Sequence, residues 1–310
     1  MKIAIIGAGA MGSLYASYLS VKNDVILFDT YDKLVNKINE DGILVIENDG
    51  SEKQYFPKAY LSGTEVGSVD LLIMFVKNSV TKEALKSNLT LVGPETVVMT
   101  LQNGAGNNKD IAEYVNKNKI IVGTTAHNSV SKELATVYHS GVGPSYIGPN
   151  VKNEEMLEKL QTVKETFNES GLNMDIINDI QKVLWKKIFV NCAINGLSMV
   201  MNCKIGLIYD NKYLWDIALN IIDECIMISE VDGSHFDRDE IIASVKEVIK
   251  VNETGLASMC QDRRNLRKTE IDRINGAIVN IGLENNIATP YNTMLVKMVH
   301  AVEDSYLENK

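Results

Sequence analysis

The sequence predicts an α/β protein, with a Rossmann-type doubly wound N-terminal domain followed by an all-helical C-terminal domain. Three observations predict this class. A glycine-rich turn follows the first apolar run, short apolar runs alternate with helical patterns through the first half, and strand-like runs stop after about Asp179. We therefore place the two domains at residues 1–178 and 179–310.

Composition and charge exclude several classes of protein. The chain has 310 residues, 45% hydrophobic and 23% charged, and a net charge of −9, which disfavours nucleic acid as a partner. Its four cysteines form no C-x-x-C pair, so we expect reduced thiols, no metal site and a cytoplasmic location. Because no apolar run reaches the roughly 18 residues that a membrane span needs, we expect no membrane association.

The first half alternates strands with helices, which predicts a parallel sheet covered on both faces. The predicted strands are Lys2–Ile6, Asp24–Phe28, Asp70–Val76, Thr96–Leu101 and Lys119–Val122, and helices include Met11–Lys22 and Tyr31–Glu40. We expect an antiparallel excursion at Ile43–Ile46 and Gln54–Leu61, and a second small β region at Thr136–Ile147. The second half shows helical periodicity only, with helices predicted at Lys182–Val200, Tyr213–Val231, Asp239–Lys250 and Met259–Ile281.

The turn after the first strand has the G-x-G-x-x-G spacing of a dinucleotide-binding loop. Its residues are Gly7, Ala8, Gly9, Ala10, Met11 and Gly12. In such a loop the glycines permit a tight turn, close approach of the pyrophosphate and close helix–strand packing. The helix that follows offers free N–H groups to the phosphates. We therefore predict that the first domain binds a nicotinamide dinucleotide.

Asp29, at the end of the second strand, bears on the choice of cofactor. A carboxylate there accepts hydrogen bonds from the ribose diol and repels a 2′-phosphate, which favours NADH over NADPH. The alternative interpretation is that Asp29 or Asp32 caps the next helix.

Several further segments, taken with the glycine turn, resemble the ketopantoate reductase (2-dehydropantoate 2-reductase) family over nearly the whole chain. They are Phe75-Val76-Lys77, Leu101-Gln102-Asn103-Gly104, Gly123-Thr124-Thr125-Ala126-His127, the stretch from Leu184 to Asn195, Ser258-Met259-Cys260-Gln261-Asp262, and the stretch from Thr269 to Gly276. The resemblance implies hydride transfer from NADPH or NADH to the ketone of a 2-oxo acid, bound between the two domains.

The resemblance also implies roles for individual residues. Lys187 would be the general acid, and Glu270 would be its partner or would contact the substrate hydroxyl. Substrate-binding groups would be Asn103, Asn191, Asn195 and Ser258, and Lys77 and Asn103 would lie near the cofactor.

The residues alone leave these roles open. Lys187, Asn191 and Asn195 are spaced i, i+4, i+8 on an apolar predicted helix, so the buried polar groups require partners that a ligand would supply. Alternatively, Lys187 lies at a solvated helix end and the asparagines bond to backbone. A lysine partly shielded from water would suit protonation of an alkoxide, because its pKa falls towards neutrality.

The other candidates also have structural alternatives. Glu270, which we place in the Met259–Ile281 helix, could pair with Arg267 or Arg273. Ser258 could be a plain N-cap. Asn103 could serve an Asn-Gly turn, and Lys77 could be a solvated loop cation. We interpret His127 as structural.

Two departures from the family pattern keep other functions open. Gly255-Leu256-Ala257-Ser258-Met259 stands where members often have Asn-x-Ser-Ser-Met, and Asp29 departs from the usual NADPH preference. An alternative is therefore an NADH-dependent D-2-hydroxyacid dehydrogenase acting on branched or aromatic 2-oxo acids. A second alternative is an NAD(P)-sensing regulator without catalysis. The helices of the second half are compatible with a homodimer.

Overall fold

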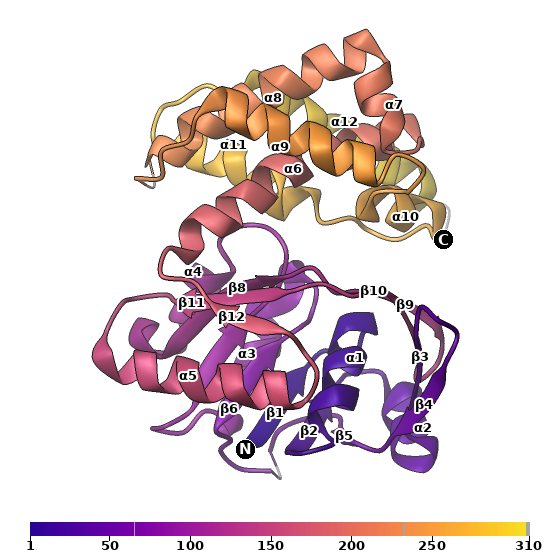
Figure 1. Ribbon diagram of the computed structural model, residues 1–310, viewed down its shortest axis with the longest axis vertical. Helices are drawn as coiled ribbons and strands as arrows, with labels where there is room; N and C mark the ends of the chain where they lie inside the picture. Colours follow the sequence, from indigo (N-terminus) through magenta and orange to yellow (C-terminus); the bar gives the residue numbers. More distant parts are fainter. Residues whose placement is uncertain (65, 232, 308–310) are drawn as a thin grey trace. The chain divides into compact units, whose positions relative to one another are not determined.

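The computed structural model describes residues 1–64, 66–231 and 233–307 (Figure 1). The chain forms two compact units. The first comprises Met1–Gln102 and Asn107–Ile180, and the second Asn103–Gly106 and Gln181–Lys310. The predicted boundary after residue 178 lies two residues before the passage into the second unit at Ile180. Within the described ranges, no helix is both long and apolar enough to cross a membrane.

The first unit is built on an eight-stranded sheet. Its strands, in spatial order, are β12 (Met174–Ile176), β11 (Ser145–Pro149), β8 (Ile120–Thr125), β7 (Val97–Thr100), β6 (Leu71–Met74), β1 (Lys2–Ile6), β2 (Asp24–Phe28) and β5 (Lys58–Tyr60). The strands from β8 to β5 are parallel, and β11 runs antiparallel to β8. This is the doubly wound order, and the predicted parallel sheet is confirmed. Successive strands are added in one direction from β1 to β2 and in the opposite direction from β6 to β8, and such folds bind ligands at the carboxyl ends of the strands where this order reverses.

Helices connect these strands. They are α1 (Ala10–Leu19), α2 (Asp32–Asp41), α3 (Thr81–Ser87), α4 (Asn107–Ala112) and α5 (Glu154–Glu169), with 3₁₀ turns η1 (Asn78–Val80), η2 (Leu89–Leu91) and η3 (Lys117–Lys119). Rings of Tyr15 on α1 and Phe167 on α5 lie 6.0 Å apart, so these two helices share one face of the sheet. Right-handed crossovers place α3 and α4 on the other face. Buried side chains of α1, α2, α5 and the strands form one apolar core.

A separate four-stranded sheet lies against α1. It contains β4 (Glu52–Tyr55), β3 (Ile43–Ile46), β10 (Thr136–Gly141) and β9 (Asn128–Glu133). The predicted antiparallel excursion is correct for β3 and β4 but wrong for β5, which joins the main sheet parallel to β2. Pro57 separates β4 from β5, and a residue without an N–H cannot continue the ladder. Likewise, the predicted Thr136–Ile147 region is divided between the two sheets.

All regular secondary structure among the described residues of the second unit is helical, and loops connect the helices. Its helices are α6 (Ile180–Met201), α7 (Gly206–Asp210), α8 (Lys212–Val231), α9 (Arg238–Val251), α10 (Ser258–Arg264), α11 (Asn275–Glu284) and α12 (Pro290–Leu307), with the 3₁₀ turn η4 (Ile271–Arg273). Helix α6 is apolar on nearly every side and passes through the core of the unit, with Phe189 and Cys192 fully buried. An all-helical second domain is therefore confirmed.

One predicted helix is wrong. The stretch Met259–Ile281 is divided into α10, a loop, η4 and α11. Helix α10 ends because Leu266 adopts a left-handed φ of 53°, and the N–H of Arg267 turns back to the carbonyl of Asp262 at 2.9 Å. Glu270 consequently lies in the loop just before η4 and not in a helix.

Candidate cofactor and acid–base site

The glycine turn is held tightly between β1, β6 and α1. Gly7 has φ +105°, and a Cβ there would lie 2.7 Å from the backbone nitrogen of Val76. A Cβ on Gly12 would lie 1.8 Å from the carbonyl oxygen of Gly7. Both positions therefore require glycine for the fold itself, and together they bring the start of α1 to the carboxyl ends of β1 and β6.

Gly9 differs from its neighbours, since a Cβ there would meet nothing described within 4 Å. Packing of the chain does not account for this glycine, but close approach of a pyrophosphate would. Gly9 is also the N-cap of α1, where no side chain caps the helix and no acidic residue occupies the first turn, in a segment that is fully described. The free N–H groups at this helix end suit an anion, so these residues fit a dinucleotide phosphate.

Asp29 lies next to this turn. Its Oδ2 accepts a hydrogen bond from the N–H of Ala8 at 2.9 Å, and its Oδ1 accepts one from the N–H of Tyr31 at 3.0 Å. The first bond ties the carboxylate to the glycine loop, and the second orients it at the start of α2. The N-cap of α2 is Tyr31, without a side-chain capping bond among the described atoms, so the helix-cap interpretation of Asp29 or Asp32 does not hold.

Lys77 and Gln102 follow β6 and β7 at the same edge of the sheet. Lys77 is exposed and begins the η1 turn. The side-chain amide of Gln102 donates to the carbonyl of Val76 at 2.7 Å and to Thr81 Oγ1 at 2.9 Å, which ties the two strand ends together. Lys77 thus lies at the carboxyl edge of the sheet, next to the end of β6.

Lys187 and Glu270 come together in the helical unit. Lys187 is half-buried on α6, between the buried residues Trp185 and Ile188. Burial lowers the pKa of Lys187 to about 8, and the nearby Glu270 carboxylate raises it in part. Its ammonium therefore titrates close to neutral pH, as a general acid must. The alternative that Lys187 forms a solvated helix end is not supported, whereas Lys186 beside it is exposed.

The amides on α6 lie at successive turns from Lys187. Asn191 is half-buried and its side chain makes no hydrogen bond to any described residue. Asn195 is 8% exposed, and its Nδ2 lies 3.4 Å from Ser258 Oγ. Ser258 is exposed and is the first residue of α10. The helix begins there as expected, but the N-cap is Ala257, so the plain N-cap interpretation of Ser258 is wrong.

Asn103 lies in a loop that packs with the helical unit. The N–H of Ala105 donates to the carbonyl of Arg273 at 3.0 Å, and a Cβ on Gly104 (φ +81°) would lie 2.2 Å from that same oxygen. The Asn103-Gly104 pair therefore serves a turn, as the alternative interpretation holds. Through Gly104 and Ala105 the turn packs against Arg273, the last residue of η4 and three residues after Glu270.

Family comparisons agree with this geometry. The profile described as Ketopantoate reductase PanE/ApbA matches residues 3–152, and the profile described as Ketopantoate reductase PanE/ApbA C terminal matches residues 179–303. The chain belongs to the ketopantoate reductase PanE/ApbA family. Curated 2-dehydropantoate 2-reductases from Lactococcus lactis and Pyrococcus horikoshii are 32% and 34% identical to it, each over 98% of both chains.

Solved structures of this family fold include two kinds of enzyme. The ternary structure of D-mandelate dehydrogenase with NADH and anilino(oxo)acetate has a TM-score of 0.92 and 31% identity, over 99% of both chains. A 2-dehydropantoate 2-reductase structure from Enterococcus faecalis, titled as putative, has a TM-score of 0.78 and 29% identity over the same share of each chain. The scaffold is thus shared between relatives named for different substrates, D-mandelate and 2-dehydropantoate.

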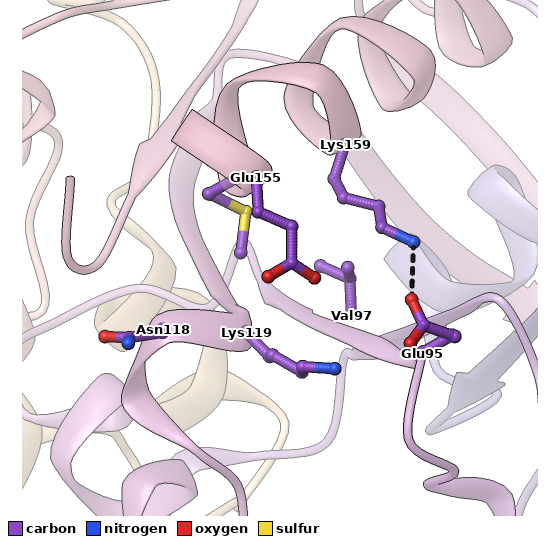
Figure 2. A pocket seen from close by; sticks show the side chains of 7 residues that line it. Glu95, Val97, Asn118, Lys119, Glu155 and Lys159 are labelled. Carbon is purple, nitrogen blue, oxygen red and sulfur yellow. Dashed lines mark hydrogen bonds and ion pairs between the residues drawn. The ribbon is translucent and has the colours of Figure 1, made fainter. Parts of the chain in front are cut away.

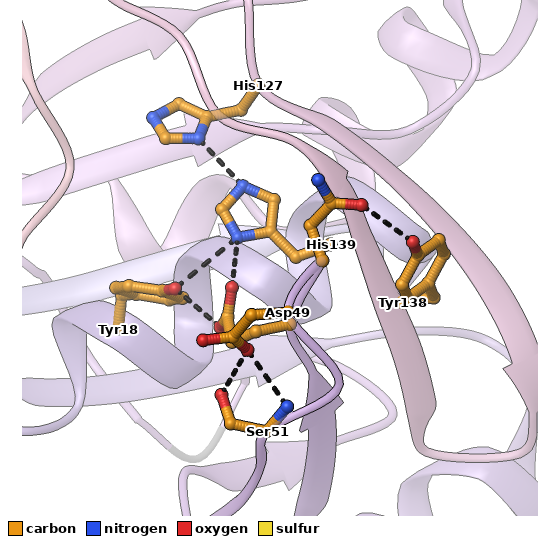
Figure 3. A network of polar contacts seen from close by, with 8 residues as sticks. Tyr18, Asp49, Ser51, His127, Tyr138 and His139 are labelled. Carbon is orange, nitrogen blue, oxygen red and sulfur yellow. Dashed lines mark hydrogen bonds and ion pairs between the residues drawn. The ribbon is translucent and has the colours of Figure 1, made fainter.

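Within this ketopantoate reductase fold, His127 belongs to a buried polar network and not to the acid–base pair (Figure 3). Its Nδ1 lies 2.9 Å from His139 Nε2, and His139 Nδ1 lies 2.8 Å from Glu47 Oε2. A carboxylate only accepts hydrogen bonds, so Nδ1 of His139 donates to Glu47. Burial, with the charge of His139, lowers the pKa of His127 to about 4, which fits the structural role that the sequence indicates.

Figure 2 shows a small cavity in the first unit. Its lining includes Val97, the first residue of β7, and Lys119, just before β8, so it is at the amino ends of the strands. It has a volume of about 10 Å³, room for no more than one water molecule. Lys159 and Glu95 pair beside it at 3.2 Å. We assign it no role in binding.

Sequence reasoning missed the residues that contact the neighbours of Glu270. The N–H of Thr269 donates to Oε1 of the buried Glu303 at 2.6 Å, and His300 lies between Glu303 and Asp272. The available signal was a histidine and a glutamate at i, i+3 on one helix. Such a pair is ordinarily read as a surface contact, because periodicity does not reveal what a buried carboxylate contacts.

Proposed function

We propose that this chain is an NAD(P)H-dependent reductase of a 2-oxo acid, acting on 2-dehydropantoate to form pantoate. The observation that carries the proposal is the side chain of Lys187. Its amine lies near Glu270 and has a pKa of about 8, and Asn191 and Asn195 follow it on the next two turns of the same helix. Its curated relatives of 32% and 34% identity are named 2-dehydropantoate 2-reductases.

The glycine turn and Asp29 hold the cofactor in this proposal. The amides at the start of α1 bind the pyrophosphate, Gly9 leaves room for it, and Asp29 accepts from the ribose hydroxyls. When bound, the reduced nicotinamide supplies a hydride to the keto carbon.

The helical unit supplies the proton. The Lys187 ammonium donates to the keto oxygen as negative charge develops there, which stabilises the alkoxide and completes the 2-hydroxy acid. Glu270 keeps a larger fraction of Lys187 protonated by raising its pKa. Asn103, Asn191, Asn195 and Ser258 orient the 2-oxo acid with their amide and hydroxyl groups.

A second function is favoured by a specific observation. Asp29 is fixed beside Ala8 and opposes a 2′-phosphate, and a D-mandelate dehydrogenase solved with NADH is 31% identical over 99% of this chain. An NADH-dependent D-2-hydroxyacid dehydrogenase is therefore the competing proposal.

One experiment separates the two. Steady-state rates are measured with NADH and with NADPH against ketopantoate, 2-oxoisocaproate and an aromatic 2-oxo acid. Ketopantoate having the highest kcat/KM supports the first function. A preference for the branched or aromatic acids by tenfold or more supports the second. If no acid is turned over but the cofactor binds tightly, both enzyme functions are excluded and the NAD(P)-sensing regulator is supported.

Two further proposals concern the intact protein. We expect a homodimer, tested by light scattering of the purified chain, and a cytoplasmic location, tested by fractionation of the source cells.

A further inference from the structure

Glu270 stands between two residues that α12 holds in place. The N–H of Thr269, just before it, donates to Glu303 Oε1 at 2.6 Å. Asp272, two residues after it, has its Oδ1 2.8 Å from His300 Nε2. His300 Nδ1 lies 3.0 Å from Glu303 Oε2, so one histidine connects both contacts. We call Asp272, His300 and Glu303 the α12 clamp.

The α12 clamp is held by hydrogen bonds between a histidine and two carboxylates. Ionised carboxylates only accept hydrogen bonds, so His300 between Asp272 and Glu303 bonds to both when each ring nitrogen carries a proton. Burial lowers the pKa of His300, but its hydrogen bonds to Glu303 and Asp272 and their charges outweigh burial and raise it. Glu303 is only 2% exposed, and a carboxylate buried to that degree needs such partners.

The clamped segment has little regular structure of its own. Glu270 precedes η4, and it follows a loop in which Leu266 adopts a left-handed φ of 53°. Its carbonyl accepts from the N–H of Arg273 at 3.0 Å, within a single 3₁₀ turn. Anchors outside the segment must therefore set the position of the Glu270 carboxylate, since a short 3₁₀ turn holds its residues weakly.

The same segment seats the loop that carries Asn103. The carbonyl of Arg273, at the end of η4, accepts from the N–H of Ala105, and Gly104 packs against that oxygen. A displacement of η4 would therefore move both Glu270 and the Asn103 loop.

We infer that His300 and Glu303 are positioning residues, which hold Glu270 beside Lys187 and the Asn103 loop on η4. The inference rests on the proposed function, in which Glu270 supports the proton donor. His300 and Glu303 need not touch substrate or cofactor. They act through Glu270, so their loss reproduces part of the loss of Glu270 itself.

The test is a double-mutant cycle of His300→Ala with Glu270→Gln in the full chain, assayed with the best substrate found above. We expect His300→Ala to lower kcat by roughly 10- to 100-fold, since small misplacements of reacting groups have effects of this size. Because Glu270 raises the pKa of Lys187, the fall of kcat at high pH should begin at lower pH in His300→Ala, as in Glu270→Gln. In the Glu270→Gln background, His300→Ala should change kcat less than threefold.

A matched control comes from the same unit. His235 also pairs with a carboxylate, Glu230, but is exposed and contacts none of the clamped segment among the described residues. His235→Ala should retain kcat and its pH profile. His300→Lys, which restores a cation between the carboxylates, should recover part of the lost rate. If His300→Ala does not fold at the assay temperature, Asp272→Ala breaks the same bridge from its exposed side.

The outcomes separate the clamp from the proposed function. Additive effects of His300→Ala and Glu270→Gln, or an unmoved pH profile in His300→Ala, would overturn the clamp alone. Full activity of Glu270→Gln would remove the role of Glu270 in the proposed function, and the clamp with it.

Discussion

The proposed cofactor cradle and the proposed acid–base pair are built from different parts of the polypeptide. The cradle uses backbone N–H groups within one short turn, and a neighbouring carboxylate orients it. The pair uses two side chains, Lys187 on a long buried helix and Glu270 on a loop held by α12. We therefore expect cofactor binding to be sensitive mainly to added side-chain atoms in the cradle, and turnover to be sensitive mainly to the loss of the charged groups of Lys187 and Glu270.

The largest expected effect is on the proton donor. Lys187→Ala should lower kcat by about 10³–10⁴-fold, because it removes the group that protonates and stabilises the developing alkoxide. Lys186→Ala is the matched control, since its side chain is exposed on the next position of the same helix. Stopped-flow binding of NADH should be unchanged in both. A kcat for Lys187→Ala within tenfold of the parent would remove the proposed proton donor.

Two glycine variants test the steric side of the comparison. Gly12→Ala should destabilise the first unit, because its Cβ would meet the Gly7 carbonyl at 1.8 Å. Gly9→Ala should fold normally but weaken cofactor binding by about 100-fold, since its Cβ occupies the space needed for the pyrophosphate. Thermal melts and titration with NADH and NADPH measure the two effects separately. Normal cofactor affinity in Gly9→Ala would contradict the assignment of the cradle.

The two sites also differ in how far the sequence predicts them. The turn from Gly7 to Gly12 is local, so its conformation follows from the glycines and the strand before it. Glu270 was placed in a helix that does not exist, because its surroundings depend on Glu303, 33 residues later, and on the left-handed Leu266. Family resemblance identified Glu270, but only the structure shows what holds it.

Strands show the same dependence on distant partners. Apolar strands such as β1 and β2 were predicted to the residue because burial on both faces leaves a continuous apolar run. β9 was missed because it is largely exposed and carries polar side chains, and β12 because it has three residues. Whether β5 joined β3 or β2 depended on strand pairing, which hydropathy does not encode.

Cofactor preference is expected to change with Asp29. Asp29→Asn removes the negative charge and should shift the ratio of kcat/KM values towards NADPH by about 10- to 100-fold, which is about 1.4–2.8 kcal/mol of differential binding. Asp32→Asn is the control, because Asp32 bonds only to the N–H of Lys33 among described groups. An unchanged NADH to NADPH ratio in Asp29→Asn would place the ribose elsewhere.

The pH profile should report the acid–base pair directly. Lys187 must be protonated to donate, so the rate of ketone reduction should fall as pH rises through about 8. Glu270→Gln removes a charge that raises this pKa, so the fall should begin at lower pH. Rates with saturating substrate across pH 6–10 measure the shift. A move to higher pH would show that Glu270 does not act on Lys187.

The smallest effect is expected from the histidine network of the first unit, where burial favours the uncharged form of His127. The pKa of His127 lies near 4, below its ordinary 6.5, so an unfolded chain binds a proton there that the folded chain does not. Stability from this group is complete above pH 6.5 and falls as pH drops towards 4, by about 1–3 kcal/mol. His127→Asn keeps a side chain that can hydrogen-bond to His139 but cannot titrate, so its melting temperature should fall less between pH 6.5 and 4.5 than that of the parent. His235→Asn, at an exposed histidine, should follow the parent instead. Equal slopes for parent and His127→Asn would show that His127 takes up a proton without loss of stability. The contrast between an uncharged His127 in one unit and the charged α12 clamp in the other would then fail.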